Sequence, residues 1–316
     1  MQIGILVAEM IVIFLLILMG CAGYRSGRIS DSGVKTCSYL VVNLCNPALL
    51  LSNAIAEEAP VPAPKMHAAI YAAVLAYVIL IPLSYLVSRL IRAPEKDDYA
   101  YRMMTIYGNV GFIGIPVCSA VLGSASLLYI SINCMVFNVT FYTYGMASMR
   151  RAARLQTGEA RKPVKASEIL KDIINVGTVS SLLSVLIYML DPKVPMILAD
   201  SLRITGNATV FLSMIVLGAS LAQSDLREMI LADPRMYLFL PVRMLLIPAI
   251  FVTVFSSFIK DPVFLGTTAI LVSLPGANLP LMYAKELELD DRELSRGIIL
   301  STVFSLVTIP LVCVLL

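Results

Sequence analysis

The fold of this 316-residue chain is decided by one stretch, residues 107–123, which reads Tyr107-Gly-Asn-Val-Gly-Phe-Ile-Gly-Ile-Pro-Val-Cys-Ser-Ala-Val-Leu-Gly123. It is apolar enough to lie in a membrane, yet its glycines and Pro116 disfavour a continuous helix, and Asn109 adds a polar amide. In lipid, interrupted backbone persists only where it is buried in protein or lines a cavity, because an unpaired backbone group is costly there. The stretch therefore predicts a broken helix that lines a site.

A second stretch of the same kind lies far downstream and reads Ser273-Leu-Pro-Gly-Ala-Asn-Leu-Pro-Leu-Met282. If the half-helices that begin near Pro116 and Pro280 meet from opposite sides, two positive dipole ends converge and favour a small anion without a buried cation. The amides of Asn109 and Asn278 would orient a carboxylate there. The plainer alternative is a pair of proline kinks that shape the bundle. The candidate substrate contacts at the two breaks are Asn109, Ile113, Gly114, Pro116, Pro275, Asn278 and Pro280.

The composition places the whole chain in a membrane. Hydrophobic residues make up 59% of it and charged residues 14%, against about a quarter in soluble domains. Ten segments are long and apolar enough to be predicted as spanning helices. They are 3–24, 36–56, 67–90, 103–122, 126–149, 172–190, 204–223, 237–259, 264–284 and 297–316. We expect one all-α integral membrane domain that binds no nucleic acid. The spans contain no paired carboxylates or His/Asp cluster, so we expect no enzyme.

Lys and Arg residues gather in the loops that follow every second segment. The positive-inside rule then puts those loops in the cytoplasm, both termini outside, and the charged linker 150–171 in the cytoplasm of a multi-pass cell-membrane protein. Five segments before the linker (1–149) and five after it (172–316) would enter the membrane in opposite orientations. Inverted repeats of this kind are typical of secondary transporters.

Other polar residues in the spans are further candidates. Asn43, Asn46 and Asn138 could contact a substrate or bond a neighbouring helix. Arg243 either extends to the cytoplasmic surface or acts on the substrate. Glu9 is either hydrated near the outer surface or carries a coupling proton.

Several motifs together resemble those of the auxin efflux carrier family, which includes the plant PIN-FORMED carriers and bacterial carriers for malate or malonate. The first is Gly108-Asn-Val-Gly-Phe-Ile-Gly-Ile-Pro116. The others, in chain order, are Asn46-Pro47, Val242-Arg243, Pro248-Ala249, Leu274-Pro275 through Pro280, Tyr283-Ala-Lys-Glu286 and Leu300 through Pro310. The resemblance covers nearly the whole chain.

The resemblance implies ten transmembrane helices in two inverted five-helix repeats, with the fourth and ninth broken and crossed as in the NhaA antiporter and the bile-acid symporters. It also implies a scaffold of helices 1, 2, 6 and 7 that forms a homodimer. Helices 3–5 and 8–10 would move against that scaffold like an elevator. Asn109 matches the crossover asparagine, and Pro116 with Pro275 or Pro280 match the crossover prolines. Asn138 falls near a position that is tyrosine in plant carriers, which argues against an indole-like substrate.

The expected function is therefore a secondary transporter of small organic anions, with a carboxylate as substrate and no cofactor. Its coupling ion, H⁺ or Na⁺ if there is one, is left open. The alternatives are a membrane receptor that senses an organic anion without moving it, and a sodium-coupled symporter of the bile-acid type.

Overall fold

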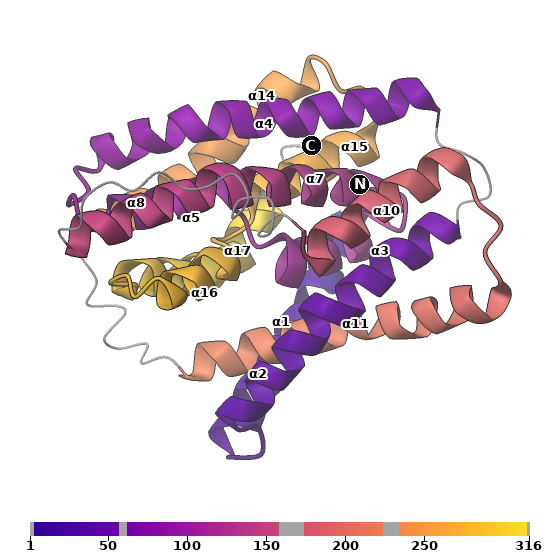
Figure 1. Ribbon diagram of the computed structural model, residues 1–316, viewed down its shortest axis with the longest axis horizontal. Helices are drawn as coiled ribbons and strands as arrows, with labels where there is room; N and C mark the ends of the chain where they lie inside the picture. The colour runs from indigo at the N-terminus through magenta and orange to yellow at the C-terminus, as the bar shows by residue number, and fades with distance from the viewer. Residues whose placement is uncertain (1–2, 57–61, 158–173, 224–233, 315–316) are drawn as a thin grey trace.

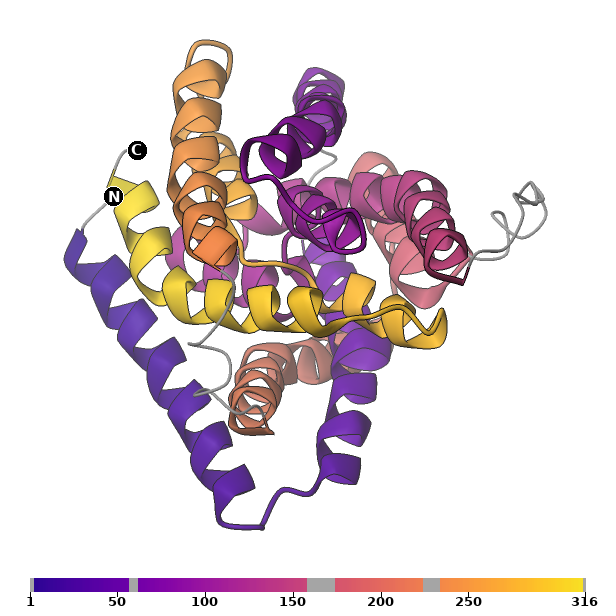
Figure 2. The ribbon, with the colours of Figure 1, turned by 90° about the vertical axis from the view of Figure 1, so that its left-hand side faces the viewer.

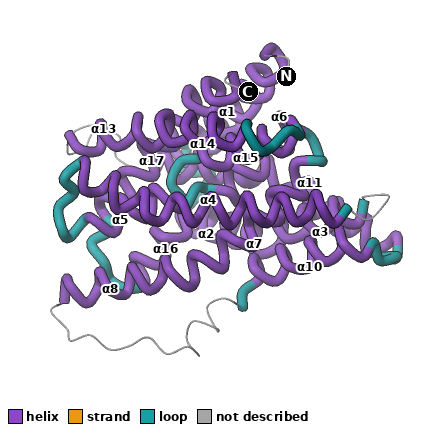
Figure 3. The backbone as a smooth tube through the Cα atoms, turned by 90° about the horizontal axis from the view of Figure 1, so that it is seen from above, coloured by secondary structure: helices purple, strands orange, loops and turns teal. Residues whose placement is uncertain are grey.

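The computed structural model describes residues 3–56, 62–157, 174–223 and 234–314, which fold into helices joined by short connections (Figures 1 and 3). The first half contains α1 (Ile3–Arg25), α2 (Asp31–Leu40), α3 (Asn46–Ile55), α4 (Ala63–Leu90), α5 (Asp98–Ile106), α6 (Ile115–Leu122), α7 (Ser126–Thr140) and α8 (Met146–Thr157). The second half contains α10 (Val176–Leu190), α11 (Met196–Gln223), α13 (Pro234–Pro241), α14 (Ile247–Ser256), α15 (Pro262–Ser273), α16 (Asn278–Glu286) and α17 (Arg292–Val314). In these ranges, six helical stretches are long and apolar enough to cross a membrane, and four apolar helices are shorter. The expected all-helical membrane fold is confirmed.

Several helices extend beyond the apolar segments that predicted them. The second begins at Asp31 rather than at 36, because Ser30 Oγ accepts a hydrogen bond from the Gly33 amide at 3.2 Å and caps the first turn. The helix expected at 204 begins at Met196. Both extensions contain charged residues (Asp31 and Lys35 in the first, Asp200 and Arg203 in the second), which lower the local hydropathy of turns that are nevertheless helical.

Wide π turns join consecutive helices at four places. They are Val41–Cys45 between α2 and α3, Val110–Gly114 before α6, Phe141–Gly145 between α7 and α8, and Val242–Leu246 between α13 and α14. Pro47, Pro116 and Pro248 are each the second residue after one of these turns. A proline lacks an amide donor and crowds the preceding turn, and a π turn provides the extra room. Pro116 therefore continues its helix, and the expectation that the chain breaks there is wrong.

The fourth segment breaks at Tyr107–Asn109 instead, and the ninth at Leu274–Ala277. The two extended pieces lie antiparallel and form the one isolated β-bridge of the described ranges, Gly108 with Gly276. The Asn109 amide donates to the Pro275 carbonyl at 2.8 Å, and the Ala277 amide donates to the Tyr107 carbonyl at 2.9 Å. Each break thus supplies the hydrogen bonds that the other lost, which is how both persist inside a membrane protein.

Glycine on each extended piece suits the close packing around the bridge. A Cβ atom on Gly108 would lie 3.0 Å from Leu274 Cβ, and one on Gly276 would lie 3.1 Å from Ile298 Cγ1. The Gly276 amide donates to Ser301 Oγ of α17 at 3.2 Å. The crossing of the two segments is therefore fixed both by backbone pairing and by the helix behind it.

Helices α1, α2 and α11 lie on one side of the molecule, and α4 and α14 lie on the opposite side (Figure 1). Figure 2 shows α1 and α2 diverging from the loop that joins them. The start of α1 and the end of α17 lie close together in all three views.

Helix α1 approaches α11 closely through two glycines. A Cβ on Gly20 would lie 2.3 Å from the Ile215 carbonyl oxygen, and one on Gly218 would lie 1.9 Å from the Ile17 carbonyl oxygen. Cys21 Sγ donates to the Gly218 carbonyl at 3.0 Å across the same contact. Small residues commonly allow such close backbone packing between membrane helices.

Gly218→Ala is expected to lower the thermal stability of the purified protein, because the added methyl group meets backbone that a side-chain rotation cannot move. Overpacking of this kind costs about 1–3 kcal/mol. The melting midpoint in detergent, followed by size-exclusion chromatography after heating, measures the effect. Gly33→Ala is the control, since its Cβ would meet only ordinary contacts, the nearest being 3.4 Å from Ser30 Oγ. Equal midpoints for the two variants would contradict the close α1–α11 contact.

Candidate functional site

A cavity of about 170 Å³ lies beside the crossing, between α3, α7, α10 and the first turn of α16. Four asparagines line it: Asn46, Asn109, Asn138 and Asn278. They lie far apart in the sequence, and each was a candidate for substrate contact. The fold brings all four to one cavity.

Asn109 is the most buried of the four, at 3% exposure. Its Oδ1 accepts from the Phe112 amide at 3.2 Å, so it caps the half-helix that begins at Val110. Its Nδ2 has no hydrogen-bond partner among the described residues. A buried donor without a partner costs about 1–3 kcal/mol, which a bound acceptor such as a carboxylate oxygen would recover.

Asn46 and Asn138 supply further amide groups from α3 and α7. Asn46 Nδ2 donates to the Gly111 carbonyl at 3.2 Å, and its Oδ1 is buried without a partner in the described ranges. The Asn138 side chain is 9% exposed and lies near Gly177 of α10. Asn278 is half-buried and is the first residue of α16. Together these amides can both donate to and accept from a polar ligand.

The two half-helices that begin at Val110 and Asn278 both start at this cavity. The positive ends of their dipoles therefore lie beside the four amides, an arrangement that favours a negatively charged group. A phenylalanine pair and a methionine form an apolar part of the same wall. These residues are Phe112, Phe137 and Met282.

The two helices that end at the crossing, α5 and α15, direct their last carbonyl groups to Arg243. Its Nε donates to the Met104 carbonyl in the last turn of α5 at 2.9 Å, and its Nη1 donates to the Val272 carbonyl in the last turn of α15. The side chain is 1% exposed. The expectation that Arg243 extends to the membrane surface is wrong, because the broken helix ends offer carbonyl acceptors inside the protein. A buried cation therefore lies at the crossing, although it does not line the cavity of the four asparagines.

Behind the crossing, Arg243 lines a second cavity of only about 40 Å³. Gly108 and Val110 border both this cavity and the larger one. Asn133 also faces the small cavity, and its Oδ1 is buried without a partner in the described ranges. Arg243 and the four asparagines thus lie on different sides of the bridge.

The remaining sequence candidates do not line the larger cavity. Gly114 packs on Leu274, where a Cβ would lie 2.8 Å from Leu274 Cδ1. Asn43 Nδ2 donates to the Tyr39 carbonyl of its own helix at 3.1 Å. The others, all buried in the helices or connections around the crossing, are Ile113, Pro116, Pro275 and Pro280. The side chain of Glu9 and residues 158–171 of the charged linker lie outside what the structure describes.

Sequence reasoning missed the contribution of α10. Gly177, Ser180 and Ser181 line the cavity, and both serine hydroxyls donate to the Gly177 carbonyl, at 3.1 and 2.7 Å. The signal was a run of small polar residues in an otherwise apolar helix. Among the described residues, no three His, Cys, Asp or Glu side chains come together as metal ligands do.

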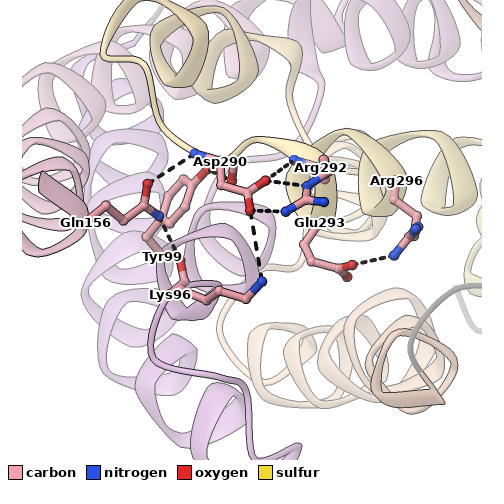
Figure 4. A network of polar contacts seen from close by, with 7 residues as sticks. All are labelled: Lys96, Tyr99, Gln156, Asp290, Arg292, Glu293 and Arg296. Carbon is pink, nitrogen blue, oxygen red and sulfur yellow. Dashed lines mark hydrogen bonds and ion pairs between the residues drawn. The ribbon is translucent and has the colours of Figure 1, made fainter.

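A polar network joins the loop before α5, the end of α8 and the loop before α17 (Figure 4). Asp290 accepts from Arg292 Nε at 2.8 Å and Arg292 Nη2 at 2.6 Å, and these bonds hold the pKa of Asp290 low, at about 2. The Asp290 amide donates to Gln156 Oε1 at 3.1 Å, and Gln156 Nε2 donates to the Lys96 carbonyl at 3.2 Å. Asp290 is therefore ionised at neutral pH in a network that joins three segments.

Comparison with known proteins points to a membrane transport family. A family model described as "Membrane transport protein" matches residues 5–313. A protein of Methanocaldococcus jannaschii that bears the name "Uncharacterized transporter MJ1031" is 21% identical over 316 residues, which cover 95% of this chain and 96% of the relative. The range matched by the family model spans the two interrupted segments and the four asparagine positions of the cavity.

Proposed function

Because the chain belongs to the membrane transport protein family that contains the auxin efflux carriers, we propose that it is a secondary transporter of small organic anions. One observation carries the substrate class: two half-helix amino ends and four asparagine amides lie on a single cavity. A carboxylate is the anion that such donors suit, because each oxygen accepts several hydrogen bonds.

In this proposal Asn109 Nδ2 donates to the carboxylate, and the amides of Asn138 and Asn278 complete its polar surroundings. The carbon skeleton packs against Phe112 and Phe137. The cavity volume of about 170 Å³ suits a small molecule. Arg243 does not bind the substrate; it stabilises the opposite ends of the broken helices, so that the amino ends stay together at the cavity.

Transport would proceed by alternating access of an elevator type. The cavity lies between α3 and α10, which belong to the proposed scaffold, and the crossing with α7, which belongs to the proposed moving part. Relative movement of the two parts would carry the anion across the membrane. The same proposal includes two inverted five-helix repeats and a homodimer formed through the scaffold helices.

The test is uptake into proteoliposomes, or current on a solid-supported membrane, with malate, malonate, lactate and indole acetate. Malonamide is the matched neutral compound, since it keeps the skeleton of malonate without its charge. We expect flux of at least one carboxylate above protein-free liposomes and none of malonamide. Saturable binding of a carboxylate without flux would instead support a receptor, and would refute the transport proposal.

A further inference from the structure

A further polar cavity lies away from the crossing and is larger than the one lined by the four asparagines. Its volume is about 790 Å³, and it lies between the end of α4, the start of α5 and α8. Its lining includes four cationic side chains and two carboxylates. The cations are Arg89, Lys96, Arg102 and Arg151, and the carboxylates are Glu95 and Asp98. The cavity is therefore positively charged overall.

Two of the four cations are held by the protein itself. Arg102 lies 2.8 Å from Asp98 Oδ2 through its Nε, and its guanidinium stacks over the Tyr85 ring at 4.5 Å. Lys96 lies 4.0 Å from Asp290 Oδ2, within the network of Figure 4. These contacts hold Arg102 and Lys96 in the wall of the cavity. The positive charge of these two side chains is largely balanced by Asp98 and Asp290.

The other two cations, Arg89 at the end of α4 and Arg151 in α8, are exposed and make no ion pair with the described residues. Ser148, also in α8, lines the same cavity at 8% exposure, and its hydroxyl has no partner among the described residues. These two arginines and this buried hydroxyl are donors that suit an anion with several oxygens, such as a phosphate, and outnumber the Glu95 carboxylate of the same lining.

Apolar surface continues from the mouth of this cavity. Tyr85 lines the cavity and is 39% exposed, and the next residues on the outer face of α4 are Leu86 and Leu90, also exposed. Leu155 of α8 lines the cavity and is 60% exposed. A ligand with a phosphate and an acyl chain would use both the charged cavity and this surface, whereas a free phosphate would use only the first.

We propose that this cavity binds the phosphate head group of an anionic membrane lipid. Arg89 and Arg151 would contact the phosphate, the Ser148 hydroxyl would donate to it, and an acyl chain would lie along Leu86 and Leu90. The site is separate from the transport cavity and goes beyond the proposed function.

The test measures lipid binding to the purified full chain by native mass spectrometry, with phosphatidylglycerol as the anionic probe and phosphatidylcholine as the neutral one. Wild type is expected to prefer phosphatidylglycerol. The variant Arg89→Gln with Arg151→Gln is expected to lose roughly tenfold or more of that preference, because each basic group near a membrane surface contributes substantially to anionic lipid binding. The control is Arg25→Gln with Arg28→Gln, which removes equal charge from the exposed end of α1 and the loop after it and should keep the preference.

A second variant, Ser148→Leu, fills the cavity without changing charge and should weaken phosphatidylglycerol binding. Inorganic phosphate and malonate serve as competitors. Unchanged preference in the Arg89 and Arg151 variant would overturn the proposal. Displacement of the lipid by inorganic phosphate at equal affinity would assign the cavity to a soluble phosphate, and displacement by malonate would make it an entrance for the transported anion; either result rejects the lipid site.

Discussion

Asn109→Asp is expected to abolish carboxylate transport at neutral pH while the protein folds and elutes like wild type. The substitution keeps the shape of the side chain, and a carboxylate oxygen can still accept from the Phe112 amide as the present Oδ1 does at 3.2 Å. It places a negative charge where the substrate carboxylate is proposed to bind. Two like charges about 4 Å apart at an effective dielectric constant of about 20 repel by about 4 kcal/mol, or roughly a thousandfold in affinity.

Asn109→Ser distinguishes the two roles of Asn109, the Nδ2 group that donates to the substrate and the Oδ1 atom that caps the half-helix. Serine also caps helices well, so the half-helix should persist, but the Nδ2 donor is lost. A hydrogen bond to a charged group contributes about 1.5–3 kcal/mol, so the KM for the carboxylate should rise roughly tenfold or more. Initial uptake rates over a range of substrate concentrations provide this measurement.

Asn43→Asp is the matched control for both variants. It adds the same charge to a membrane helix, but Asn43 lies outside the cavity and bonds the Tyr39 carbonyl of its own helix. Its uptake should stay within about twofold of wild type. If Asn109→Asp transports as well as Asn43→Asp does, the cavity at the crossing does not hold the anion.

Arg243→Met should cause a second large effect, a loss of both stability and transport. Methionine fills a similar volume but donates no hydrogen bond, so the Met104 and Val272 carbonyls at the ends of α5 and α15 lose their donor. Each buried carbonyl without a partner costs about 1–3 kcal/mol. The melting midpoint in detergent and the uptake rate in liposomes should both fall.

Arg243→Lys tests whether the charge or the geometry matters more. Lysine keeps the positive charge near the two negative helix ends but is a point donor rather than a planar fork, so we expect intermediate stability. Arg203→Met is the surface control, because Arg203 forms an exposed pair with Asp200 that contributes about 0–1 kcal/mol. A melting midpoint for Arg243→Met equal to that of Arg203→Met would exclude a stabilising role at the crossing.

Hydropathy and the positions of glycine, proline and asparagine were enough to predict a helical membrane protein with two interrupted segments. The family match over residues 5–313 confirms the resemblance seen in the motif at Gly108–Pro116. The placement of the break was wrong, because the sequence shows Pro116 but not the π turn that accommodates it. The bridge between Gly108 and Gly276 depends on two segments far apart in the chain, and no local pattern specifies their register.

Part of the cavity lining could also be predicted from the sequence. Asn46, Asn109, Asn138 and Asn278 stand out because amides are rare in apolar segments, and all four line one cavity. Asn43 is equally conspicuous in the sequence but does not line the cavity, because its position around the helix directs its side chain elsewhere. Arg243 was misread because its two acceptors exist only after the fourth and ninth segments have broken. The role of α10 depends on its packing beside α7, which its own sequence does not reveal.

The bridge at the crossing also sets an order of events during synthesis. Tyr107 and Asn109 enter the membrane long before the ribosome has made Pro275 and Ala277, to which their backbone groups bond. Until then the Tyr107 carbonyl and the Asn109 amide of the fourth segment lack these hydrogen-bond partners. The first half of the chain therefore completes its own backbone pairing only after the second half has been inserted, and a stop codon after the linker would leave a membrane segment with unmet hydrogen bonds.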